Sequence, residues 1–282
     1  MTSLTTPRMA AVSAAPSAPA RSAGHVLVDA ATMVGRGLRL VRRDPDELVL
    51  SLVLPIMIML MFVYVFGGAM DVGTAYVTYA TPGVILLCAG YGASNTAITV
   101  SRDMTGGIID RFRSMPISSW SVLFGHIVAS VVKNLVTTAI VLGVAALIGF
   151  RPDATLLEWL AAVGVIAAYV FAITCVATFF GVLVRSPQAA GGFGFAMLFL
   201  PYVSSAFVPP GTMPAWLQGF ADHQPVTPVI ETIRGLLVGL DSTGAPVSDL
   251  TGTSALALAW CTGIAVVSLG AAVAVFVRKR RA

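Results

Sequence analysis

Charged side chains are scarce in this chain of 282 residues. Only 11% of the residues are Asp, Glu, Lys or Arg, whereas 57% are hydrophobic, and the mean hydropathy is +0.88. An ordinary soluble domain has about 25% charged and about 45–50% apolar residues. This imbalance excludes a water-soluble globular protein. The 14 phenylalanines and the many aliphatic side chains also exclude a chain that is mostly disordered.

Lysine occurs at only two positions, Lys133 and Lys279. A P-loop that binds ATP requires the pattern G-x-x-x-x-G-K-[ST], in which the lysine contacts the β- and γ-phosphates. Asn134 follows the first lysine and Arg280 follows the second, so neither lysine belongs to this motif. We therefore predict that the chain is not an ATPase and binds no nucleotide itself.

Cysteine and histidine do not show the spacings of a metal or catalytic site. Cys88, Cys175 and Cys261 lie in apolar stretches without a CxxC pattern, which argues against a disulfide framework and a zinc site. The three histidines show no convergent spacing with serine, cysteine or carboxylate residues. We expect no metal, no cofactor and no catalytic residues in this chain. An intramembrane enzyme is a minor alternative.

What the sequence has instead is a set of six long apolar stretches, which cover about half of the chain. A bilayer core about 30 Å thick is crossed by about 20 helical residues, because a helix pairs its own backbone groups. The predicted fold is an all-α membrane protein with six transmembrane helices. The predicted spans are Leu48–Phe66, Tyr76–Val100, Val122–Phe150, Leu156–Val184, Ala189–Val208 and Ser254–Val277.

Positive charge is distributed unevenly among the connecting segments. Most of the 17 Lys and Arg residues lie in the segments on the N-terminal side of the membrane, whereas the opposite loops carry Arg151 and Arg234. Lys and Arg flanking the spans are retained in the cytoplasm. We therefore predict a multi-pass protein of the inner (plasma) membrane with both termini cytoplasmic. The net charge of +4 reflects this retention and indicates no nucleic-acid partner.

The region before the first span has two parts. Residues 1–24 are rich in Ala, Ser, Thr and Pro, which predicts a disordered cytoplasmic tail. In His25–Arg43 the apolar side chains share one arc of a helix, and Arg36 and Arg39 lie on the other arc. This pattern predicts a helix in the membrane interface, with a solvated basic helix as the alternative. Residues 25–282 are expected to form one transmembrane domain.

The interiors of the predicted spans contain no Asp or Glu. Ion-driven carriers usually place carboxylates there, so an ion-coupled transporter is weakened. Lys133 is the only Lys or Arg in a span interior, and it either lines a cavity or snorkels to the cytoplasmic headgroups. Asn95, Thr99 and Asn134 either face the same cavity or form hydrogen bonds between helices.

The segment Ser101–Pro116, between the second and third spans, is amphipathic. Met104, Ile108, Phe112 and Met115 recur at helical spacing, with charged residues around the rest of the helix. A short helix held beneath two spans is suited to insertion into a groove of a soluble partner. The alternative is a helix that rests on lipid headgroups.

Four segments together resemble the ABC-2 type permeases, most closely the daunorubicin-resistance-type drug-efflux branch. The resemblance covers about residues 36–280. It rests on LVLPIMIMLMFVYVFGG at Leu52–Gly68, YATPG at Tyr79–Gly83, GGIIDRFRSMPIS at Gly106–Ser118 and FVPPGTMPAWLQGFADHQPVTPVIETIRGLLVG at Phe207–Gly239.

The resemblance implies a six-span subunit that works as a dimer, either with a second copy or with a paralogue. Two separate nucleotide-binding subunits would hold ATP and Mg²⁺. In this family the loop matched by Gly107–Pro116 contains a coupling helix that docks on the ATPase, with Phe112 expected as its buried anchor. The residues that the resemblance assigns to this contact are Asp103, Gly107, Ile108, Asp110, Arg111, Phe112, Arg113 and Met115, with Arg36 and Arg39 of the interfacial helix.

The segment Pro209–Thr253 resembles the short re-entrant helices that, in this family, lie between the last two spans and cap the cavity on the outside. A folded extracellular loop is the alternative interpretation. The expected function is the permease subunit of an ABC exporter for a hydrophobic or amphipathic compound, such as a drug or antibiotic. Export of a lipid or glycolipid is the alternative within the family. An ion-coupled carrier or a channel is the alternative outside it.

Overall fold

The computed structural model describes residues 45–70, 72–106 and 119–281, together with four helical residues between Thr32 and Arg39. Within these residues the secondary structure is helical, apart from one isolated bridge between Leu240 and Pro246. The all-α fold class is therefore confirmed. The predicted tail, most of the predicted interfacial helix His25–Arg43 and the coupling loop at residues 107–118 lie outside the described residues.

Five helices of the described residues are long and apolar enough to cross a membrane. They correspond to the first four predicted spans and to the last. These helices are α2 (Pro45–Leu60, continued by the π-helical turn η1 at Met61–Phe66), α3 (Tyr76–Thr105), α5 (Ser119–Ile148), α6 (Leu156–Leu183) and α10 (Leu250–Arg281).

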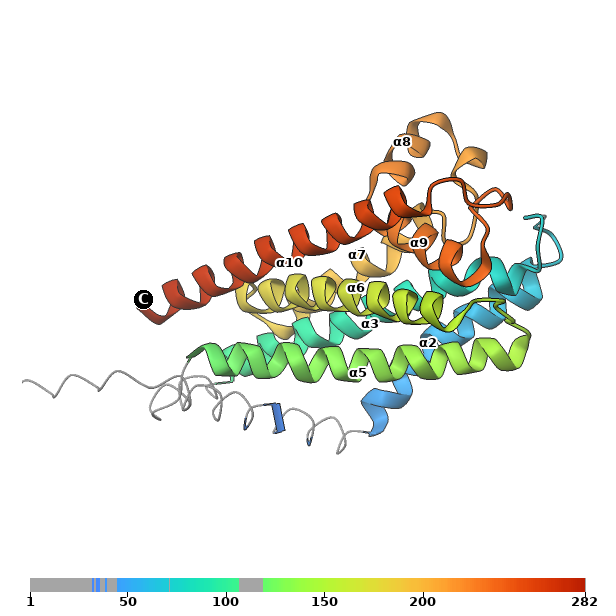
Figure 1. Ribbon diagram of the computed structural model, residues 1–282. Helices are drawn as coiled ribbons and strands as arrows, with labels where there is room; N and C mark the ends of the chain where they lie inside the picture. Colours follow the sequence, from blue (N-terminus) through green and yellow to red (C-terminus); the bar gives the residue numbers. More distant parts are fainter. Residues whose placement is uncertain are drawn as a thin grey trace, which may run out of the picture.

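The long helices lie alongside one another with alternating directions. α3, α6 and α10 run toward the end of the bundle that holds the C-terminus, and α2 and α5 run the opposite way (Figure 1). We refer to these two ends as the C-terminal end and the α9 end. At the α9 end, Thr155 and Glu158 form a capping box that begins α6. This accounts for the one acidic residue that falls in the first turn of a predicted span.

The predicted fifth span, Ala189–Val208, is not one continuous α-helix. α7 (Pro187–Phe199) is followed by the 3₁₀ turn η2 (Leu200–Val203) and then by non-helical backbone. α7 is too short to count among the five candidate spans, but α7 and η2 together rise roughly 27 Å, close to the thickness of a bilayer core. The six-span topology therefore stays a prediction.

Side chains from neighbouring elements hold the segment 200–207, in which the helix breaks down. Most of its residues are buried, including Ser204 and Ser205. Ser204 Oγ also donates to the carbonyl oxygen of Pro201, at 2.6 Å. Buried irregular backbone is tolerated only where other protein groups supply its missing hydrogen bonds. The donors from outside the segment are Gln224 Nε2 to the carbonyl oxygens of Leu200 and Val203, Tyr76 Oη to that of Phe207 (2.8 Å) and Arg234 Nη2 to that of Ser205 (2.6 Å).

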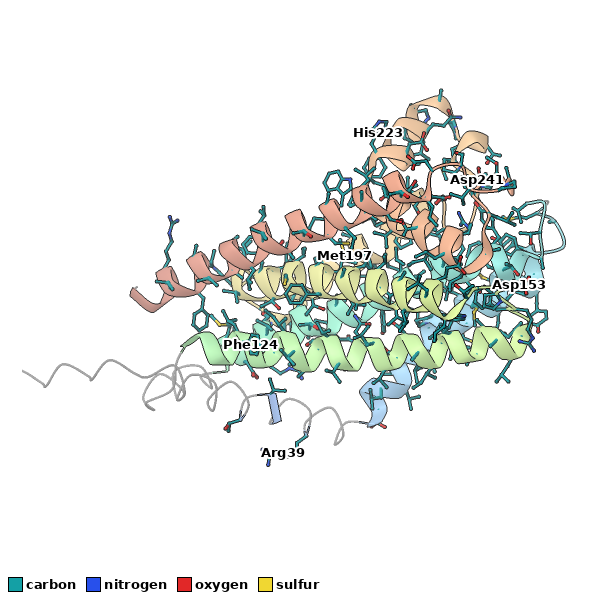
Figure 2. All side chains as sticks on the ribbon, viewed as in Figure 1. Arg39, Phe124, Asp153, Met197, His223 and Asp241 are labelled. Atoms are coloured by element: carbon teal, nitrogen blue, oxygen red, sulfur yellow. The ribbon has the colours of Figure 1, made fainter. Side chains whose placement is uncertain are left out.

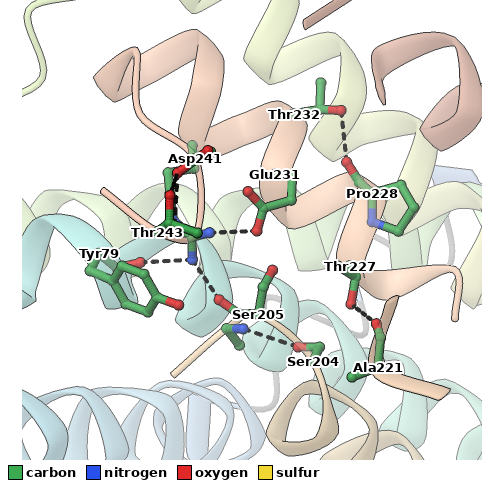
Figure 3. Close-up of polar contacts among 12 residues, drawn as sticks. Tyr79, Ser204, Ser205, Ala221, Thr227, Pro228, Glu231, Thr232, Asp241 and Thr243 are labelled. Carbon is green, nitrogen blue, oxygen red and sulfur yellow. Dashed lines mark hydrogen bonds and ion pairs between the residues drawn. The ribbon is translucent and has the colours of Figure 1, made fainter. Parts of the chain in front are cut away.

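Two short helices, α8 (Ala215–His223) and α9 (Val226–Val238), follow the 3₁₀ turn η3 (Pro210–Thr212) and precede α10. α9 is buried over most of its length and contacts α3, α6 and α10. It ends at Gly239, whose φ of 75° is the left-handed conformation typical of a helix C-terminus. Thr227 Oγ1 donates to the carbonyl oxygen of Ala221 and ties α9 to α8 (Figure 3). Whether these helices are re-entrant stays a prediction.

α3 is the central helix of the bundle, because it is buried over most of its length and contacts α2, α5, α6, α7 and α9. Glycine allows neighbouring backbones to approach it closely. A Cβ atom added to Gly83 would lie 2.5 Å from Cβ of Ala206, and one added to Gly181 of α6 would lie 2.7 Å from the carbonyl oxygen of Ala97. Small residues at crossings are typical of membrane helices, because lipid supplies no hydrophobic force between helices.

The contact at Gly83 predicts a specific sensitivity to overpacking. We expect Gly83→Ala to lower the melting temperature of the purified protein in detergent, because the methyl group meets buried backbone that has little room to move, at a cost of about 1–3 kcal/mol. Gly164→Ala is the matched control, since a Cβ atom there meets open space. Equal melting temperatures for the two variants would contradict the close packing of α3 against the segment 200–207.

Candidate functional site

The predicted coupling loop stands in the sequence between α3 and α5, and the end of α3 and the beginning of α5 lie at the C-terminal end of the bundle (Figure 1). Arg39 of the predicted interfacial helix is described, and its exposed side chain donates from Nε to the carbonyl oxygen of Gly35 at 3.0 Å. The other predicted contact residues, apart from Asp103, lie outside the described residues, and their role stays a prediction. They are Arg36, Gly107, Ile108, Asp110, Arg111, Phe112, Arg113 and Met115.

A contact between a histidine and an aspartate joins the two helices directly behind this loop, and it is an ion pair when the histidine is protonated. Nε2 of His126 in α5 lies 3.2 Å from Oδ2 of Asp103 in α3, and the two side chains are only 14% and 12% exposed. Charges that are largely buried are screened by salt less than surface charges are. The structure thus gives Asp103 a partner within the chain. His126 was missed by the sequence analysis, which considered histidine only as a catalytic or metal-binding residue.

A small hydrophobic cluster surrounds the same end of the bundle. It is separate from the main core and takes one buried side chain from each of α3, α5, α6 and α10. Met104 and Val275 pack against it. The end of α3 and the beginning of α5, which flank the coupling loop, are therefore held to each other and to α6 and α10 by packing as well as by the contact between Asp103 and His126. The buried members are Val100, Leu123, Val182 and Phe276.

Two of the predicted cavity residues, Lys133 and Asn134, lie near the middle of α5, and one of them has a packing role. Asn134 is buried, and its Nδ2 donates to the carbonyl oxygen of Ala89 in α3 at 2.8 Å. This supports the helix-to-helix interpretation for Asn134. Asn95 and Thr99 are half-buried on α3. Lys133 is half-buried in α5, about 15 Å along the helix from Leu123, where the apolar span begins. The choice between a cavity position and snorkelling for Lys133 stays a prediction.

Arg234 lies at the α9 end, and sequence analysis counted it only as a cation of an outer loop. The structure buries it to 1% exposure. Its guanidinium joins three elements (Figure 3). Nη1 donates to Oε1 of Glu231 at 2.6 Å, while Nη2 donates to the carbonyl oxygens of Ser205 at 2.6 Å and Tyr79 at 3.3 Å. Its Cζ also lies 4.1 Å from the centre of the Tyr79 ring, a cation–π contact.

We call Tyr79, Ser205, Glu231 and Arg234 the Arg234 cluster. The sequence did carry a signal for it, namely a glutamate and an arginine three residues apart in an otherwise apolar helix. Such a pair in a membrane protein is expensive to bury and therefore indicates a specific internal partner.

The turn after α9 is fixed by Asp241. Its Oδ1 accepts hydrogen bonds from Thr243 N, Thr243 Oγ1 and Ala245 N. Partial burial alone would raise the pKa of Asp241, but these hydrogen bonds and the charge of Arg234 hold it below its usual value. The ionised carboxylate therefore stabilises this turn above the pKa of the unfolded chain, and the stabilisation is lost as the pH falls through the folded pKa.

The ion pair at the C-terminal end predicts coupled stability effects. Asp103→Asn and His126→Gln should each lower the melting temperature by a few degrees, because either change removes the same interaction, worth about 1 kcal/mol. The double variant should melt no lower than the single variants, since neighbouring groups that share one contact are not additive. Additive decreases in melting temperature would show that Asp103 and His126 stabilise the bundle independently.

Comparison with known proteins assigns the amino-acid sequence to a family. The model of the ABC-2 type transporter family matches residues 29–238, which include α2, α3, α5, α6, α7 and α9. A daunorubicin resistance ABC transporter permease protein of Streptomyces coeruleorubidus is 29% identical over 210 residues, which are 74% of each chain. A probable doxorubicin resistance ABC transporter permease protein of Mycobacterium tuberculosis is 29% identical over 227 residues, or 80% of this chain and 79% of the relative.

The family match covers most of the chain, and the five long apolar helices agree with a protein that crosses the membrane several times. The resemblance inferred from the sequence motifs is thereby confirmed. This chain belongs to the ABC-2 type transporter family of membrane permeases.

Proposed function

We propose that this chain is the transmembrane subunit of an ATP-driven exporter and that separate nucleotide-binding subunits supply the energy. The observation that carries the proposal is the family match over residues 29–238, together with relatives named as permease proteins of ABC transporters. The chain has no P-loop lysine, so ATP and Mg²⁺ would be bound by the partner. A second permease subunit, either another copy or a paralogue, would complete the pathway.

The proposed cargo is a hydrophobic or amphipathic compound of the drug or antibiotic type. The relatives are named for resistance to daunorubicin and doxorubicin, which supports this class. The membrane helices agree with it, because they offer many apolar surfaces and few fixed charges to a substrate.

The proposed orientation places the C-terminal end of the bundle in the cytoplasm. Arg102, Arg185 and Arg278 lie where α3, α6 and α10 finish, at this end. Asp153 and Asp241 lie at the α9 end (Figure 2). Retention of Lys and Arg on the inside supports this orientation. In this arrangement α7 and η2 make the sixth crossing, and residues 204–207, α8 and α9 lie at the outer side.

The proposed mechanism is mechanical coupling through the loop between α3 and α5. Closure of the partner ATPase subunits would move this loop as a rigid body and switch access to a central pathway from inside to outside. The ion pair between Asp103 and His126 and the hydrophobic cluster behind the loop would keep its two ends together. Motion of the loop would then be passed on to the helices of the bundle.

Phe112→Ala tests this coupling. In a complex copurified with its nucleotide-binding subunit, we expect the variant either to lose that subunit or to hydrolyse ATP without transport, because the aromatic anchor of the contact is gone. Phe171→Ala, an exposed phenylalanine within the span of α6, is the matched control and should leave assembly and coupling intact. Normal assembly and normal transport per ATP in Phe112→Ala would remove the proposed role of the loop.

A further inference from the structure

The segment 200–207 and α9 together form the part of the α9 end that packs against the beginning of α3. We propose that Arg234 is a positioning residue for transport, which locks α9 and the segment 200–207 onto the first turns of α3 in the closed state. The lock opens when the α9 end opens to release cargo. This inference rests on the proposed export function, because it assigns the α9 end to the exit of the pathway.

The contacts of Arg234 make it the link between three elements that are distant in sequence. Its own helix is α9, its Nη2 reaches Ser205 in the irregular segment, and the Tyr79 carbonyl and ring belong to α3. The ion pair with Glu231 lies within α9 and is kept when α9 moves away from α3, whereas the contacts with Ser205 and Tyr79 cross between elements. Separation of α9 from α3 therefore has to break these contacts together. The closed and open arrangements are then two separate states with no stable intermediate between them.

The cluster is not fully satisfied in the closed arrangement. Within the described residues, Tyr79 Oη, Ser205 Oγ and Arg234 Nε are buried and have no hydrogen-bond partner. Buried polar groups almost always find partners, so three such atoms in one cluster need an explanation. An open arrangement that admits water would satisfy them and offset part of the broken contacts. The closed and open states are then close enough in free energy for a transport cycle to switch between them.

α3 connects this lock with the coupling loop. Tyr79 and Asp103 lie 24 residues apart on the same helix, which corresponds to roughly 36 Å. Pro82 follows Tyr79 by three residues and cannot donate a backbone hydrogen bond, which weakens α3 at this point. The first turn of α3 can therefore tilt against the rest of the helix. Displacement of the loop at one end of α3 would pull on Tyr79 at the other end.

The test uses a cysteine as a reporter of opening. Ser205→Cys replaces a fully buried hydroxyl with a thiol of similar shape, and the three native cysteines are buried. Labelling is measured with a membrane-impermeant maleimide added from the outside to cells or oriented vesicles that contain the full complex. With Arg234 present and no ATP, we expect slow labelling. With Arg234→Gln and no ATP, labelling should be about tenfold faster, the change produced by about 1.4 kcal/mol lost from the closed state.

Two controls separate positioning from a general loss of structure. Arg151→Gln removes an exposed arginine at the same end and should leave the labelling rate unchanged. Arg234→Lys keeps the charge and should restore slow labelling in part. The Arg234→Gln complex should also keep ATP hydrolysis while transport per ATP falls about tenfold, whereas a misfolded variant would lose both.

If Arg234→Gln does not assemble, labelling of Ser205→Cys in the otherwise unchanged complex tests the same inference. Labelling that accelerates during ATP turnover supports the lock. Labelling that stays slow while transport proceeds overturns it, as does slow labelling in an assembled Arg234→Gln complex. Failure of the export function would appear differently, as a complex that neither hydrolyses ATP nor transports while the effect of Arg234→Gln on resting labelling persists.

Discussion

A buried peptide group has to find its hydrogen-bond partner within the protein, and this constraint decides how the α9 end of the molecule is built. A continuous helix satisfies the constraint by itself, as α3 and α6 do. The segment 200–207 cannot, and donors from three other elements replace the missing ladder: Tyr76 of α3, Gln224 after α8 and Arg234 of α9. Its stability therefore depends on side chains far away in sequence. The backbone of this segment is fixed while the donor side chains are in place, and it becomes free to move when they move away.

α3 relates this region to the opposite end of the bundle. It is the most buried of the long helices, it starts beside the Arg234 cluster, and it ends at the loop that resembles the family's coupling helix. Close packing through Gly83 and Gly181 leaves little freedom for α3 to move without its neighbours. The proposed mechanism needs such an element, because force applied at the loop between α3 and α5 would have to reach the exit of the pathway. Both the ion pair at Asp103 and the cation–π contact at Tyr79 lie on this helix.

Hydropathy was sufficient to predict five long helices and the all-α class, since each of these five apolar runs maps onto one continuous long helix. It could not show that the helix breaks down after Phe199, because the residues beyond are as apolar as those before, and Pro201 was the only local sign. Arg234 was misread because the sequence analysis used cations between spans only to decide which side of the membrane a loop lies on. That use gives no information on whether the side chain is buried. The choice for Asn134 between facing a cavity and forming a hydrogen bond between helices depended on Ala89. This partner is 45 residues away, and no local pattern reveals it. The contact residues of the coupling loop remain predictions, because they lie outside the described residues.

We propose that this permease moves its cargo only with energy from a partner ATPase. Reconstitution into liposomes tests this directly, with doxorubicin, the compound in the name of the Mycobacterium tuberculosis relative, as the transported probe. We predict ATP-dependent and Mg²⁺-dependent doxorubicin accumulation when the nucleotide-binding subunit is present, and none with the permease alone under any ion gradient. Accumulation driven by an ion gradient in liposomes that contain only the permease would contradict the account.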